Sequence, residues 1–252
     1  MTVSRGAHQH SVQIYADVRE LAQSVAAFFS AGLASGAPAV LIATAAHEPV
    51  YREELERLGW EVEQLLSDGL LVTRDAERLL DTLVRDGYPS SSAFDELVGG
   101  LLDDVGARFP DTVTHAFGEM VDVLCRRGQH EAAVSLEELW NSLAWSRSFV
   151  LLCGYELDVF DPELQRSVLP DICRTHTHVT PAGDPRRLAL AVDDALERVL
   201  GTDEADRIAA LVADEHEERV PRAQHTLMWV SEHLPGDADE ILAAARAHYA
   251  AG

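Results

Sequence analysis

Apolar residues in the amino-terminal part of the chain follow two alternating patterns, one typical of strands and one typical of helices. The segment 11–15 alternates polar and apolar side chains, whereas 39–43 is an unbroken apolar run, as in strands covered on both faces. Together the patterns predict strands at 11–15, 39–43, 70–73, 113–117 and 149–153, and helices at 18–33, 48–58, 76–84, 91–108, 119–127 and 131–145.

This regular alternation predicts an α/β fold with three layers, in which helices cover both faces of a mainly parallel sheet. Ligands in such folds bind at the carboxyl ends of the strands. The residues that follow the predicted strands are therefore the first candidates for a site: 15–17, 44–47, 73–75, 118–119 and 154–156.

The carboxyl-terminal part of the chain has a different pattern. After 180–183 no further strand is predicted, and four apolar stripes at helical spacing follow, at 188–199, 208–212, 227–234 and 241–249. We therefore expect a sheet domain at 8–181 and an acidic, all-α extension at 182–252.

Composition and charge exclude several functions. The 252 residues carry a net charge of −23, which disfavours direct binding to nucleic acid or to anionic membranes. All 20 basic residues are Arg, so the chain has no lysine for a phosphate-binding loop or a Schiff base. The turn at 15–17 also has no glycine and contains Asp17, so no nucleotide cofactor is expected.

Cysteine usage and the short length of the apolar runs indicate a cytoplasmic protein. The three cysteines show no pairing pattern typical of a secreted disulfide framework. The first ten residues lack the apolar core of a signal peptide, and no apolar run is long enough to span a bilayer.

One segment has the residue types of a metal site. Cys173, His176 and His178 place a thiol and two imidazoles within six residues, and all three are ligands for zinc or iron. With Glu119 as a general base, this set would make a metalloenzyme. The alternative is a buried thiol at the end of a helix, with histidines that cap the helix and bond to its backbone.

Two further groups of residues have a structural and a chemical interpretation. Cys153, Glu119 and a histidine would suit nucleophilic catalysis, although a thiol in an apolar strand is more commonly packed and inert. In the helix at 131–145, Glu137 accompanies an apolar stripe, and Asn141 either contacts a ligand or loop or is solvated.

Several blocks of this sequence resemble the MEDS domain, the methanogen/methylotroph sensory domain of dichloromethane-responsive regulators and many histidine kinases. The blocks are His10 with Tyr15, Phe29 with Gly32-Leu33, Phe117-Gly-Glu-Met-Val121, Leu136-Glu-Glu-Leu-Trp-Asn141, Leu151-Leu-Cys-Gly-Tyr155, and Ile172-Cys173 with His176. The resemblance covers about residues 8–181. It implies a cytoplasmic sensor of small hydrocarbon derivatives, with a fold similar to RecA-like ATPases that have lost the phosphate loop.

The leading hypothesis is therefore a non-enzymatic sensor that binds a small molecule and signals through a protein partner, such as a kinase or a transcription regulator. The residues expected to bind the ligand are His10, Tyr15, His47, Glu119, Tyr155 and His176. Two alternatives stay open, a zinc or iron enzyme with Cys173, His176 and His178 as ligands, and a protein-interaction scaffold with no ligand.

Overall fold

The computed structural model describes residues 9–215 and 218–251. Contacts between residues divide this part of the chain into two compact units. The first contains the residues up to Gln13 and Asp17–Glu156, and the second contains Ile14–Ala16 and the residues from Leu157 onward. The domain boundary expected at 181/182 thus lies inside the second unit.

A six-stranded sheet confirms the predicted fold class. Its strands are β1 (His10–Tyr15), β2 (Ala39–Ala43), β3 (Leu71–Asp75), β6 (Thr114–Gly118), β7 (Phe149–Glu156) and β8 (His178–Thr180), in the order β3-β2-β6-β7-β1-β8. The pairs β2–β3, β2–β6 and β6–β7 are parallel, so the carboxyl ends of these four strands lie at the same edge.

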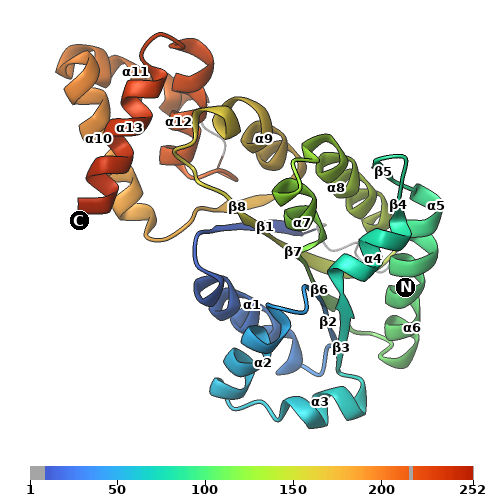
Figure 1. Ribbon diagram of the computed structural model, residues 1–252. Helices are drawn as coiled ribbons and strands as arrows, with labels where there is room; N and C mark the ends of the chain where they lie inside the picture. Colours follow the sequence, from blue (N-terminus) through green and yellow to red (C-terminus); the bar gives the residue numbers. More distant parts are fainter. Residues whose placement is uncertain (1–8, 216–217, 252) are drawn as a thin grey trace. The chain divides into compact units, whose positions relative to one another are not determined.

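Helices cover both faces of the sheet in the first unit, with α1 and α2 on one face and α4, α6 and α8 on the other (Figure 1). Their bounds are α1 (Val18–Leu33), α2 (Glu48–Arg57), α3 (Val62–Asp68), α4 (Ala76–Leu83), α5 (Ser91–Phe94), α6 (Gly100–Arg108), α7 (Met120–Arg126) and α8 (His130–Ala144). All five side chains of β2 are buried, as expected for a strand between two helical layers.

Local sequence explains where the helices begin and end. The Asp17 side chain accepts a hydrogen bond from the Arg19 amide, and Asp75 caps α4 in the same way. Gly69 ends α3 in the left-handed conformation, at a φ of 69° that side chains with a Cβ seldom adopt.

Three local features differ from the predicted elements. The helix α3 was not predicted, and the turn after α4 is flanked by the short antiparallel strands β4 (Val84–Arg85) and β5 (Tyr88–Pro89). The helix expected at 91–108 contains a π-helical turn at Asp95–Gly99 between α5 and α6. A π-helical turn contains one residue more than an α-helical turn, and Val98 and Gly99 of this turn are buried.

The second unit is mainly helical, which confirms the predicted carboxyl-terminal helical region. It contains α9 (Pro162–Thr175), α10 (Pro185–Leu200), α11 (Thr202–Glu215), α12 (Arg222–His233) and α13 (Ala238–Ala251). α10 packs against α13, and α12 packs against α9. Its strand β8 was not predicted, because three residues are too few to show a period.

Across the described residues, no helix combines the length and the apolar character that crossing a bilayer requires.

Candidate functional site

A buried carboxylate lies at the edge of the sheet where β2 and β6 end. Glu119 follows β6 directly, is fully buried, and accepts a hydrogen bond from the Thr44 amide at 2.8 Å. Its other oxygen, Oε1, lies 2.8 Å from His47 Nδ1 and accepts the hydroxyl of Tyr51 on α2. One side chain thus holds both the turn after β2 and the first turns of α2.

The same His47 lines a hollow of about 290 Å³, which we call the strand-end hollow. Its lining consists of Thr44, Ala46, His47, Glu77, Val123, Arg126 and Arg127. The hydrogen bond to Glu119 raises the pKa of His47 above its ordinary value of 6.5, against the opposing effect of partial burial. Two guanidinium groups and an imidazole therefore offer hydrogen-bond donors to a small ligand.

The guanidinium groups of the strand-end hollow are held in place by carboxylates. Arg126 Nε lies 3.1 Å from a carboxylate oxygen of the buried Asp122, and Asp122 also accepts the Glu156 amide at 2.8 Å. Arg127 lies 3.5 Å from Glu77. The buried carboxylate of Asp122 thus orients the Arg126 side chain, whereas the pair of Arg127 with Glu77 is exposed and weaker.

A second group of polar side chains is buried where β1, β7 and α8 meet, and we call it the buried cluster. It consists of His10, Glu137, Asn141, Cys153 and Tyr155. Cys153 and Tyr155 are two residues apart on β7 and so point to the same face, while Glu137 and Asn141 are four apart on α8 and share a helix face. The two spacings bring four of the five side chains together.

Distances in the buried cluster are short. His10 Nδ1 lies 2.9 Å from Asn141 Oδ1, and His10 Nε2 lies 3.2 Å from Glu137 Oε2 and 3.4 Å from Cys153 Sγ. Tyr155 donates its hydroxyl to Glu137 Oε1 at 2.7 Å. Burial, and then the charge of Glu137, raises the pKa of both the Cys153 thiol and the Tyr155 hydroxyl well above their usual values.

The three thiols do not suit nucleophilic catalysis. All are buried, and burial raises the pKa of Cys125 and of Cys173 to about 12. A thiol with such a pKa is almost entirely protonated at neutral pH, whereas the nucleophile is the thiolate. The interpretation of Cys153 as a packed thiol is therefore the better one for the metal-free protein.

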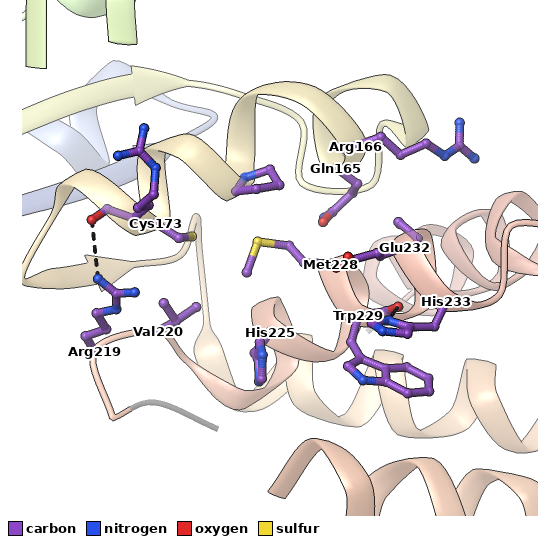
Figure 2. A pocket seen from close by; sticks show the side chains of 13 residues that line it. Gln165, Arg166, Cys173, Arg219, Val220, His225, Met228, Trp229, Glu232 and His233 are labelled. Atoms are coloured by element: carbon purple, nitrogen blue, oxygen red, sulfur yellow. Dashed lines mark hydrogen bonds between the residues drawn. The ribbon is translucent and has the colours of Figure 1, made fainter. Parts of the chain in front are cut away.

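The second unit has a larger pocket, of about 640 Å³, between α9 and α12 (Figure 2). Its lining consists of Gln165, Arg166, Pro170, Cys173, Arg174, Arg219, Val220, His225, Met228, Trp229, Ser231, Glu232 and His233. The rings of Trp229 and His233 stack at a centroid distance of 4.5 Å. Arg219 donates to the Arg174 carbonyl at 3.3 Å, as the dashed line in Figure 2 shows.

The metal set expected at 173–178 is not assembled. Cys173 lies within α9, buried His176 follows the end of that helix, and His178 is exposed on β8. His176 Nδ1 lies 2.7 Å from the Ile172 carbonyl oxygen, which is the capping role of the alternative interpretation. Among the described residues of the second unit, no three ligand atoms gather closely enough to hold one metal ion.

Four of the six expected ligand-binding residues belong to the first unit and form two pairs there. His47 and Glu119 meet at the strand-end hollow, and His10 and Tyr155 meet at Glu137. Tyr15 and His176 belong to the second unit, where Tyr15 is buried at the end of β1 and His176 directly follows α9. Within the first unit the structure thus brings the expected residues together as two pairs.

Several residues of these sites were not among the expected ones. Tyr51 and Arg126 lie on helices and Arg127 directly follows α7, away from the residues that follow the strands. The sequence gives little indication that these three residues are functional, since a Tyr on an amphipathic helix and a pair of Arg before Gly128 are ordinary features. Glu137 and Asn141 had a clearer signal, a four-residue spacing beside an apolar stripe, but the same pattern also fits a solvated helix edge.

Comparison with known proteins gives one informative match. No curated protein matches the chain. Among solved structures, "Structure of C. elegans PCH-2" has 14% sequence identity, covers 92% of this chain and 69% of that one, and has a TM-score of 0.24, which is too low to support any argument. The family model for the MEthanogen/methylotroph, DcmR Sensory domain matches residues 9–177. The chain therefore belongs to the MEDS family of sensory domains.

Proposed function

We propose that this protein is a non-enzymatic cytoplasmic sensor that binds a small, oxygenated hydrocarbon derivative in the strand-end hollow and signals through a protein partner. Membership of a sensory family supports the general role. The hydrocarbon-derivative class comes from the family resemblance. We infer that the ligand carries an oxygen atom because three residues of the lining, Arg126, Arg127 and His47, all present hydrogen-bond donors.

One observation carries this proposal: His47 lines the hollow and also bonds to the carboxylate that holds α2. Because His47 Nδ1 already faces Glu119, a ligand oxygen accepts a hydrogen bond from Nε2. A ring that donates from both nitrogens is protonated, so the ligand favours the charged ring and strengthens its bond to Glu119. Glu119 also binds the Thr44 amide and Tyr51, so the change reaches both the end of β2 and α2. Ligand binding is thereby coupled to the position of a helix.

A signal requires that the ligand bind two conformations with different affinity, and couplings of about 1–3 kcal/mol are typical. The loss or gain of one hydrogen bond to a carboxylate, about 1.5–3 kcal/mol, is of that size. The bond between His47 and Glu119 is therefore strong enough to serve as the switch. A partner, such as a kinase or a transcription regulator, would recognise the altered surface of α2.

The test uses the full chain, labelled for NMR, with three oxygenated probes, methanol, formate and acetate, and with dichloromethane as a probe that has no oxygen. We expect at least one oxygenated probe, but not dichloromethane, to shift the signals of the Thr44 amide and the His47 ring in a saturable way. Arg126→Gln and Arg127→Gln should each weaken that binding by about tenfold or more, since each removes charged donors. Arg78→Gln is the matched control, because its side chain is 88% exposed on the neighbouring helix α4.

Two results would contradict the proposal. No saturable shift with any probe would favour a protein-interaction scaffold. Binding that survives both arginine substitutions but is lost in Trp229→Ala would place the ligand in the pocket between α9 and α12 instead.

A further inference from the structure

Three potential metal ligands of different types converge in the buried cluster. His10 Nε2, Glu137 Oε2 and Cys153 Sγ all lie within 4.8 Å of one another, and the three side chains are 0–1% exposed. An imidazole, a carboxylate and a thiol are the ligand types that zinc and similar divalent ions take in proteins. None of the three belongs to the strand-end hollow.

The position of hydrogen atoms makes this arrangement unusual. An amide oxygen only accepts hydrogen bonds, so Asn141 Oδ1 fixes a proton on His10 Nδ1, 2.9 Å away. In the neutral ring Nε2 then carries a lone pair, and it faces Glu137 Oε2 at 3.2 Å. Two acceptor atoms at this distance repel each other unless a proton or a cation lies between them.

The distances fit a cation well. A tetrahedral zinc ion with bonds of about 2.0–2.1 Å to nitrogen, 2.1 Å to oxygen and 2.3 Å to sulfur would separate its ligands by about 3.4 Å for N and O and about 3.6 Å for the two pairs with S. The corresponding distances in the buried cluster are 3.2 Å for His10–Glu137, 3.4 Å for His10–Cys153 and 3.7 Å for Cys153–Glu137.

Charge supports the same conclusion. A thiolate and a carboxylate together carry two negative charges, which balance a divalent cation. The site would then be neutral, and a neutral group is the least costly one to bury. A protonated His10 beside an ionised Glu137 would also be neutral overall, but it would make no use of the thiol of Cys153.

We propose that the buried cluster is a site for a borderline-soft divalent cation such as Zn²⁺, with His10 Nε2, Glu137 Oε2 and Cys153 Sγ as ligands. Asn141 and Tyr155 act as positioning residues, since each holds the far side of a ligand and so orients the atom that binds the metal. This site is independent of the ligand proposed for the strand-end hollow.

The test is titration of the metal-free full chain with Co²⁺, followed by displacement with Zn²⁺. We expect one cobalt ion per chain, with the absorption of tetrahedral cobalt and a sulfur-to-cobalt charge-transfer band. Cys153→Ser should abolish the charge-transfer band and weaken binding strongly. Cys125→Ser is the matched control, because Cys125 is also a buried thiol of the first unit and should keep the band.

A second variant distinguishes the loss of a metal ligand from a loss of folding. Asn141→Ala should weaken cobalt binding by about 10–100-fold, the usual effect of losing an outer-shell partner, and should keep the charge-transfer band at saturation. The proposal is wrong if the wild-type chain takes up no cobalt or zinc, or if the band survives in Cys153→Ser.

Discussion

Replacement of Glu119 by Gln tests whether this carboxylate fastens α2 to the sheet. The carboxylate accepts from the Thr44 amide, from His47 and from the Tyr51 hydroxyl, and it is fully buried. If the Gln carbonyl keeps the bond to the Thr44 amide, the NH₂ group replaces Oε1, where His47 and Tyr51 donate.

The expected cost follows from those contacts. Two hydrogen bonds to a charged acceptor, each contributing about 1.5–3 kcal/mol, are lost, and the Tyr51 hydroxyl can recover about 1 kcal/mol by turning to accept from the new NH₂. We therefore expect Glu119→Gln to lower the free energy of unfolding by about 2–5 kcal/mol at low pH.

The cost should also depend on pH. The folded-state pKa of His47 is raised above the ordinary 6.5 by its hydrogen bond to Glu119. The stabilisation from this pair is therefore fully present below pH 6.5 and is lost as the pH rises through the folded-state pKa. The destabilisation by Glu119→Gln should thus be larger at about pH 5.5 than at about pH 8.5.

Urea unfolding at both pH values, followed by far-UV circular dichroism, measures the cost, and hydrogen exchange of the Thr44 amide locates it. Glu53→Gln is the control, because it removes the same charge at a side chain of α2 that is 56% exposed. It should change stability by no more than about 0.5 kcal/mol. A cost for Glu119→Gln that equals the control, or that does not vary with pH, would refute the reasoning.

Three further predictions concern packing. Gly154→Ala should cost about 1–3 kcal/mol in urea unfolding, because its Cβ would lie 3.0 Å from Leu21 Cδ2 and 3.4 Å from Phe117 Cζ; an unchanged midpoint would contradict this. Gly183→Ala should lower the melting temperature, since Gly183 has a φ of 66° and its added Cβ would collide with the Tyr249 hydroxyl; Gly106→Ala, with open space around it, is the control. In iodoacetamide labelling at about pH 8, the buried thiols of Cys125 and Cys173 should react only after denaturation, and labelling of the native protein would contradict the raised pKa of both.

The strand and helix pattern of the sheet could be predicted from the sequence because each element there has a clear period. The unbroken apolar run 39–43 coincides with β2, and 18–33 coincides with α1. The misses are short or irregular elements, such as β8 with three residues and the π turn at Asp95–Gly99. Such elements are fixed by tertiary packing, which leaves no local period in the sequence.

The candidate sites were harder to predict, because residues that follow strands meet only if their strands are neighbours. Glu119 follows β6, and His47 follows β2; they meet because β2 and β6 pair in parallel. The strand order depends on packing between distant segments, and the apolar runs do not encode it locally. The sequence could therefore indicate Glu119 and His47 as residues that follow strands, but it could not show which of the expected residues contact one another.

Glu119 and Glu137 are buried carboxylates of the first unit that have different partners, and so the two proposals can be tested separately. Glu119 accepts hydrogen bonds from a backbone amide and a hydroxyl and lies beside an imidazole that is 18% exposed. Because this imidazole is accessible to water, we expect the site to respond to pH and to small ligands. Glu137 instead faces the imidazole of His10 and the thiol of Cys153, which are fully buried. If a cation balances its charge as we propose, that cation binds as the chain folds, and we expect its loss to lower stability rather than to transmit a signal.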